Sequence, residues 1–247
     1  MKSGSDPEFL LVEDRGTVRV LTMNRPEKRN ALNTALTRSL LEALRAADAD
    51  AAVCCVVLTG AGQGFCAGAD LAEFKDQVPE FQHRVDERAE LTMQLHLAFS
   101  KMAKPVVTAI NGAAMGGGAG LAIAGDLAVM AASAQIGYPE TRHGIVAAIV
   151  MANLVRQVGR KQAFELVALG EPIDAQKALA IGMVNRVVPE REVLSEALVF
   201  AGKLADTKTE AMRATKQLFH EVADLPLKEA LERGREVNQR MRAFRKK

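Results

Sequence analysis

The sequence has few of the features that mark disulfide-rich, metal-binding or nucleic-acid-binding proteins. Its 247 residues include three cysteines, Cys54, Cys55 and Cys66, which are too few and too badly placed for a disulfide framework or a zinc site. Cys54 and Cys55 are interpreted as small strand residues in a reducing compartment, so a cytoplasmic location is expected. The formal net charge of +2 is too small to attract a polyanion, and the basic segment Arg245–Lys247 is short. No nucleic-acid partner is therefore expected.

Long apolar stretches are also missing. No segment combines the length and apolarity of a membrane span, and none has the pattern of a secretory signal, so no membrane partner is expected. Residues Met1–Phe9 are polar and patternless, and they are interpreted as a cloning scar. There is no low-complexity linker and no internal repeat. The remaining composition, 49% hydrophobic and 25% charged, is ordinary for a protein with a substantial core.

Strand and helix patterns alternate along the chain. Strands are expected at 17–23, 52–58, 105–110, 127–130 and 183–188, and helices at 32–44, at 80–102 and from Gly116 onward. Leucines repeat at helical spacing between residues 32 and 44, with Asn33 or Thr34 available as the N-cap. The alternation predicts the α/β class. Helices dominate after about residue 145, which indicates a helical portion that covers or extends the first.

Two glycine-containing turns are candidates for a binding site. Gly64–Leu71 and Asn111–Gly120 each follow a buried strand and lead toward a helix. Glycine lets the backbone approach a ligand closely, and a helix N-terminus presents free N–H donors. Two such turns that converge would supply the two donors of an oxyanion hole, although either turn alone is more often explained by tight packing. The P-loop and dinucleotide fingerprints both fail, because Gly116 and Gly118 are followed by Leu121 and no Gly-Lys-Ser/Thr ending is present.

Four sequence blocks identify a family resemblance. The blocks are Asn24–Leu32, Phe65–Leu71, Asn111–Gly112 with Gly116–Gly118, and Gly137–Glu140. In order and spacing they resemble the enoyl-CoA hydratase/isomerase (crotonase) family, from about Leu11 to the C-terminus. This resemblance implies a crotonase-like α/β fold, a spiral of ββα units. Residues 10–190 would form the acyl-CoA-binding core and residues 191–247 a C-terminal helical region. It also implies homotrimers or pairs of trimers, and no cofactor beyond the coenzyme A of the substrate.

The resemblance also assigns roles to individual residues. The oxyanion-hole N–H groups map onto Ala69 and Gly117, and the catalytic carboxylate maps onto Glu140. The expected substrate and CoA contacts are Lys28, Ala31, Ala67, Gly68, Asp70, Leu71, Met115, Gly116 and Pro139. Asp70 is also interpreted as a brace for its own loop. No metal ligand is expected.

The family's hydratases use two glutamates, and here the first of these positions is Gly120. Glu140 stands at the second position, directly after Pro139. One carboxylate can remove an α-proton and return it at another carbon, so the pattern favours Δ3-to-Δ2 enoyl-CoA isomerisation. His143, three residues further on, is considered as a proton carrier, and the only tyrosine, Tyr138, as a hydrogen-bonding or packing residue.

Other functions are kept open. A hydratase with a non-standard second acid/base, thioester hydrolysis, decarboxylation, dehalogenation and retro-aldol cleavage would share the same oxyanion hole. A non-catalytic RNA-binding protein on this fold is disfavoured by the small net charge. A serine peptidase on the related spiral fold is discounted, because neither Ser100 nor Ser133 lies in a nucleophile-like turn.

Overall fold

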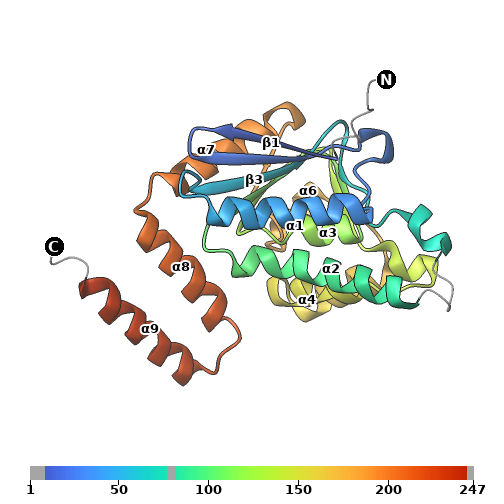
Figure 1. The fold of residues 1–247 in the computed structure, drawn as a ribbon. Helices are drawn as coiled ribbons and strands as arrows, with labels where there is room; N and C mark the ends of the chain where they lie inside the picture. Colours follow the sequence, from blue (N-terminus) through green and yellow to red (C-terminus); the bar gives the residue numbers. More distant parts are fainter. Residues whose placement is uncertain (1–8, 77–81, 244–247) are drawn as a thin grey trace.

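The larger of two β-sheets forms the centre of the molecule in the computed structural model, which describes residues 9–76 and 82–243 (Figure 1). Its strands, in spatial order, are β1 (Leu10–Arg15), β2 (Val18–Met23), β3 (Cys55–Gly60), β5 (Val106–Ile110), β7 (Leu127–Ala131) and β10 (Arg186–Val188). β1 and β2 form an antiparallel hairpin, and every later neighbour pairs in parallel. The five predicted strands are confirmed. β1 was not predicted, because as an edge strand it buries only its first residue.

A second, smaller sheet brings the glycine turns together. It contains β4 (Gly64–Cys66), β6 (Ala113–Met115), β8 (Gln135–Gly137) and β9 (Ile173–Asp174). β4 pairs in parallel with β6, and β6 pairs in parallel with β8. Each of these three strands follows a strand of the larger sheet, so the chain turns through repeated two-strand units. The short strands were not predicted, because two or three residues carry no readable alternation.

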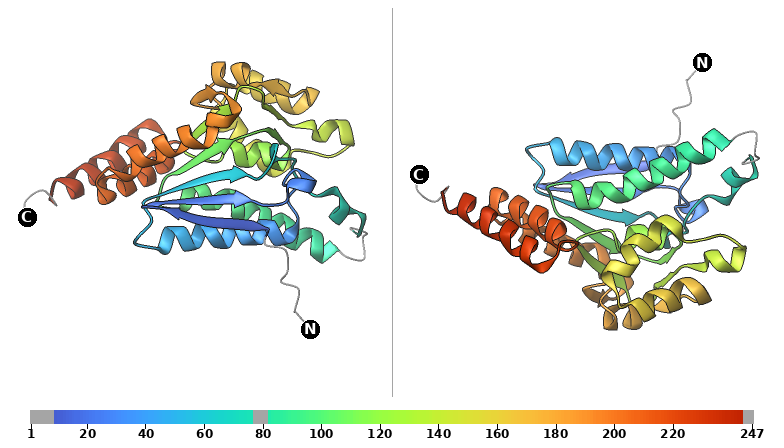
Figure 2. Two further views of the ribbon diagram at one scale, coloured as in Figure 1. Left: turned by 90° about the horizontal axis from the view of Figure 1, so that it is seen from above. Right: turned by 90° about the horizontal axis from the view of Figure 1, so that it is seen from below.

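The helices cover the larger sheet on both faces. Figure 2 shows the sheet between α1 (Thr34–Ala49) and α7 (Val193–Ala205). α1 begins where predicted, because the Asn33 side chain accepts a hydrogen bond from Leu36 N at 2.8 Å, and its leucines face the core. α2 (Gln82–Lys101) packs beside α1 and confirms the described part of the helix expected at 80–102. Glu80 and Phe81, assigned to its start, lie outside the described residues.

The last two helices leave the body as a pair. α8 (Thr209–Val222) and α9 (Leu227–Ala243) pack against each other and project from the rest of the molecule (Figures 1 and 2). The predicted boundary at residue 190 falls at the start of the short 3-10 helix η5 (Glu190–Glu192), and α7 beyond it still packs on the sheet. The other α-helices of the described residues are α3 (Gly117–Ala122), α4 (Ala148–Gln157), α5 (Arg160–Leu169) and α6 (Ala175–Ala180).

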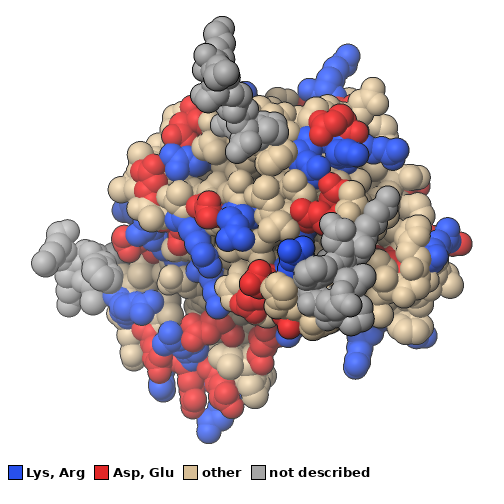
Figure 3. All heavy atoms as spheres, turned by 45° about the vertical axis from the view of Figure 1, so that its right-hand side comes forward, with Lys and Arg blue, Asp and Glu red and all other residues tan. Residues whose placement is uncertain are grey.

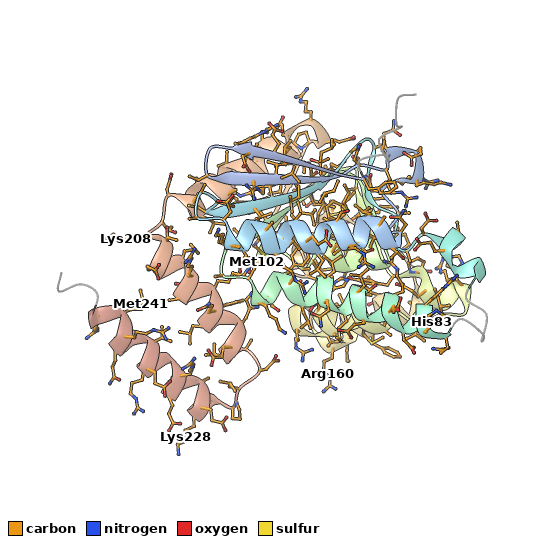
Figure 4. All side chains as sticks on the ribbon, in the orientation of Figure 1. His83, Met102, Arg160, Lys208, Lys228 and Met241 are labelled. Carbon is orange, nitrogen blue, oxygen red and sulfur yellow. The ribbon has the colours of Figure 1, made fainter. Side chains whose placement is uncertain are left out.

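The surface carries charges of both signs. Lysine and arginine are interspersed with aspartate and glutamate on the face drawn in Figure 3, and the side chains of Arg160 and Lys228 extend outward in Figure 4. Within the described residues, no helix has the length and apolarity that crossing a membrane would require. Phe9 belongs to the folded body, because Asn24 N donates to its carbonyl at 2.8 Å. The other residues interpreted as a cloning scar, 1–8, lie outside the described part.

Candidate active site

The loop after β4 directs the backbone N–H of Ala69 away from the neighbouring segment at Leu32. Leu32 N donates to Gly68 O at 2.7 Å, and Asp70 N donates to Leu32 O at 3.0 Å. Ala69 therefore forms a parallel bridge with Leu32, and its own N–H points to the opposite side. This places an amide donor, held by hydrogen bonds on both sides of it, at the edge of the loop.

The turn between β6 and α3 supplies a second amide next to the first. Gly117 is the first residue of α3, so its N–H has no acceptor within the helix. A Cβ placed on Gly117 would lie 3.8 Å from Ala69 N, and a Cβ on Gly68 would lie 3.4 Å from Gly117 N. The two amides therefore line one small space. Gly68 has φ +92°, and a Cβ there would meet Met115 O at 2.7 Å, so only glycine fits.

Glu140 lies beside this turn. The pairing of Met115 with Gly137 sets the end of β8 next to the end of β6, and η4 (Pro139–His143) begins two residues later. Glu140 Oε1 lies 3.0 Å from the position that a Cβ on Gly116 would take. The half-buried carboxyl has a pKa raised by desolvation, an effect that its own backbone N–H and His143 only partly oppose. Its Oε2 is buried without a hydrogen-bond partner among the described residues.

The space beside Gly120 is filled by other side chains. A Cβ on Gly120 would lie 2.3 Å from Val150 Cγ1, on α4, and 2.8 Å from His96 Cε1, on α2. A side chain at the family's first glutamate position would therefore collide with both. The space that this carboxylate would occupy is therefore filled by packed side chains.

Adding one methyl group at this position should destabilise the protein. We expect Gly120→Ala to lower the free energy of unfolding by about 1–3 kcal/mol, because Val150 and His96 would have to move. Urea denaturation measures the change. Gly202→Ala, in α7, is the matched control, because a Cβ there meets nothing within 4 Å. That control should be neutral or stabilising by up to about 1 kcal/mol. Equal stability of Gly120→Ala and the wild type would contradict this packing.

His96 was not singled out in the sequence. Its side chain is buried, and neither ring nitrogen has a hydrogen-bond partner in the described part of the chain. Desolvation lowers its pKa to about 4, so the imidazole is neutral at neutral pH. The sequence feature that indicates its burial is its position on the same face of α2 as the buried Leu95 and Phe99.

A buried ion pair braces the loop that carries Ala69. Arg25 Nη2 donates to Asp70 Oδ2 at 2.8 Å, and both side chains are almost fully buried. Desolvation raises the pKa of Asp70, but Arg25 and the Ala72 N–H outweigh it, so the net pKa lies below its usual value. Asn30 adds a second brace, because its side chain accepts from Arg25 N and donates to Gly64 O. Arg25 and Asn30 were not recognised as site residues, because their partners are distant in sequence.

The two loops expected to contact coenzyme A lie against each other. Ala67 N donates to Arg29 O at 2.9 Å, which joins the loop of Lys28 to the loop of Ala69. Lys28, Ala67 and Leu71 are exposed, whereas Ala31 is buried.

The other expected contacts lie at the ends of the short strands. Met115 ends β6, Gly116 follows it, and Pro139 begins η4. Tyr138 is fully buried, and its hydroxyl has no partner within the described residues. His143 is exposed at the end of η4. In the described ranges, no group of three or more His, Cys, Asp and Glu side chains could hold a metal ion.

Comparisons with known proteins identify the family of the chain. The family model described as enoyl-CoA hydratase/isomerase matches residues 13–246. A relative from Thermus thermophilus, which carries an enoyl-CoA hydratase name, is 44% identical over 207 residues, covering 83% of this chain and 81% of the relative. The 2,3-dehydroadipyl-CoA hydratase of Escherichia coli is 37% identical, covering 92% and 88%. The crystal structure of enoyl-CoA hydratase from Bacillus anthracis superposes with a TM-score of 0.89 at 31% identity, covering 94% of this chain and 90% of that one.

The matches span nearly the whole chain in both sequence and fold, and they include the segments that form the two-amide turn and the Glu140 loop. The chain has the crotonase-like α/β fold, and it is an enzyme that belongs to the enoyl-CoA hydratase/isomerase family.

Proposed function

We propose that the enzyme binds an acyl-CoA thioester with its carbonyl oxygen between the amides of Ala69 and Gly117, and that Glu140 shuttles a proton. The favoured reaction is isomerisation of a 3-enoyl-CoA to a 2-enoyl-CoA. One observation carries this proposal. The Glu140 carboxyl lies against the turn that presents Gly117 N–H, while the space beside Gly120, the family's first glutamate position, is filled by His96 and Val150.

The chemistry follows from these positions. Glu140 takes a proton from C2, and the electron pair moves onto the thioester oxygen, where the two N–H groups stabilise the negative charge. The same proton returns to C4 as the double bond moves to C2=C3, so the carboxylate is regenerated. A raised pKa suits this role, because the carboxyl must both accept and return the proton near neutral pH.

The nucleotide part of the substrate is assigned to the joined loops. We infer that the exposed Lys28 contacts a phosphate of coenzyme A, that Ala67 and Leu71 border the chain leading to the thioester, and that Asp70 acts through its brace with Arg25. Ala31, Gly68, Met115, Gly116 and Pro139 would shape the thioester end. The support is the hydrogen bond from Ala67 N to Arg29 O, which joins the loop that contains Lys28 to the loop that contains Ala69.

A trimer or a pair of trimers is proposed for the assembly. The projecting helices expose large apolar side chains, Phe219 at 67%, Leu227 at 76% and Leu231 at 64%, and contact with a second subunit would cover them. Size-exclusion chromatography with light scattering measures the subunit number, and a monomer at micromolar concentration would contradict the assignment.

Hydration of a 2-enoyl-CoA is the second candidate, favoured by the hydratase names of the relatives. The deciding experiment incubates the enzyme with matched 2-enoyl- and 3-enoyl-CoA and follows both water addition and double-bond migration. Migration without hydration supports isomerisation alone. Turnover of neither substrate would contradict the proposed acyl-CoA chemistry.

The pH dependence should report the ionisation of Glu140. Because the carboxylate is the base and its pKa is raised above 4.5, kcat/KM for isomerisation should fall as the pH drops through that raised value. The loss therefore begins at a higher pH than for an ordinary glutamate. A pH–rate profile of kcat/KM measures it. Full activity maintained down to pH 4.5 would show that no raised carboxyl acts as the base.

A further inference from the structure

The buried imidazole of His96 lacks the hydrogen bonds that its burial calls for. It is 7% exposed on α2, and within the described residues both Nδ1 and Nε2 are without a partner. A buried polar group left unpaired costs about 1–3 kcal/mol, so such groups in native proteins normally bind water or a ligand. The partner of His96 should therefore be a molecule that enters this part of the structure.

The imidazole occupies the region that the missing glutamate would have reached. Its Cε1 lies 2.8 Å from the Cβ position of residue 120. Both ring nitrogens are bonded to Cε1 at about 1.3 Å, so each lies within about 4 Å of that position. A glutamate carboxyl starts only two bonds beyond its Cβ. The ring nitrogens thus lie about as far from the Cβ position of residue 120 as the oxygens of the absent carboxylate would.

His96 and Glu140 lie against the same short helix. Glu140 contacts Gly116, at the N-terminus of α3, and His96 contacts Gly120, whose N–H donates to Gly116 O at 3.0 Å. Gly116 is the N-cap of α3 and Gly120 is the fourth residue of that helix, so the two contact points lie about one helical turn apart. Glu140 Oε2 is also buried without a partner in the described part of the chain. Two groups with unused hydrogen-bonding capacity thus lie against positions 116 and 120, about one helical turn apart.

We propose that His96 binds the water molecule that Glu140 activates, and that the enzyme therefore hydrates 2-enoyl-CoA in addition to isomerising 3-enoyl-CoA. This inference rests on the proposed acyl-CoA chemistry of Glu140. A water molecule has two O–H donors. The Glu140 carboxylate accepts one, and the unprotonated ring nitrogen accepts the other, which leaves an oxygen lone pair for C3.

The proposed step balances with His96 unchanged. The water oxygen bonds to C3 and its proton passes to Glu140, while the C2=C3 electron pair moves onto the thioester oxygen at the two amides. Glu140 then returns that proton to C2, and the product is a 3-hydroxyacyl-CoA. The imidazole stays neutral throughout, so it orients the water without taking its proton.

Replacing His96 by leucine separates the two reactions. We expect His96→Leu to lower kcat for hydration about 100-fold, the size of loss expected when a reacting group is no longer held in position, while isomerisation stays within about threefold. Phe99→Leu is the matched control, because Phe99 is a buried apolar residue on the same helix. It should affect both reactions alike and only slightly. His96→Gln, which can still accept a hydrogen bond, should recover part of the hydration activity. This variant tests the same role if His96→Leu folds poorly.

The outcomes distinguish this inference from the proposed function. Wild-type enzyme that isomerises but adds no water, or His96→Leu enzyme that hydrates at the wild-type rate, would overturn the role of His96 and leave that of Glu140 standing. Equal losses of both reactions in His96→Leu would also overturn it, because a packing defect predicts that result. Glu140→Gln should abolish both reactions, and isomerisation retained in that variant would overturn the proposed function itself.

Discussion

Glu140→Gln is expected to lower enoyl-CoA turnover about a thousand-fold while acyl-CoA binding is retained. The amide keeps the shape of the carboxyl group but cannot accept the α-proton, and a positioned acid/base contributes about a hundred- to ten-thousand-fold. Steady-state kinetics measures the loss, and isothermal titration calorimetry with a saturated acyl-CoA measures binding. Binding should survive, because Glu140 lies beside the amides and is not one of the proposed thioester donors.

The folded state should tolerate this change. Burial raises the pKa of Glu140, which means that its charged form is disfavoured in the folded protein, so a neutral amide should fold at least as well at neutral pH. Glu165→Gln, at an exposed position on α5, is the matched control and should leave turnover unchanged. Wild-type turnover in Glu140→Gln would rule out its role as the proton carrier.

Gly117→Pro is expected to lower kcat by about a hundred- to a thousand-fold, because it deletes one of the two proposed oxyanion donors. Proline is well accepted at the first position of a helix, which is where Gly117 lies, so α3 should still form. Kinetics with a 3-enoyl-CoA substrate measures the effect.

Gly117→Ala separates the lost donor from the added bulk. A Cβ at this position meets Leu32 Cδ1 at 3.5 Å, which is an ordinary contact, and the alanine keeps its N–H. We therefore expect alanine to retain most of the activity that proline removes. Equal activity of the two variants would show that the amide of Gly117 donates nothing to the transition state.

Local sequence patterns were sufficient to predict the main helices and strands. The leucines of α1 and the Asn33 cap act within one helix, and the buried strands β3, β5 and β7 are continuous apolar runs. The short strands could not be predicted in this way. Their pairing depends on partners far along the chain, and two or three residues are too few to show a period.

The candidate site was only partly accessible from sequence. The identity of Glu140 and the absence of a side chain at Gly120 are properties of single positions, and the four sequence blocks located them. Two facts could not be obtained in the same way. The bracing of Asp70 by Arg25 and the filling of the Gly120 space by His96 each join segments that no local pattern connects.

By itself, the sequence determined the class of fold, the family and the residue types available for chemistry, because periodicity, capping and motif order are properties of neighbouring positions. Tertiary structure alone decided that the amides of residues 69 and 117 line one space, that Glu140 lies beside it, and that a buried histidine stands where a second carboxylate would be. The register of β4, β6 and β8 sets the first two arrangements, and the contacts of His96 on α2 and Val150 on α4 with Gly120 set the third. These contacts form only when distant segments meet.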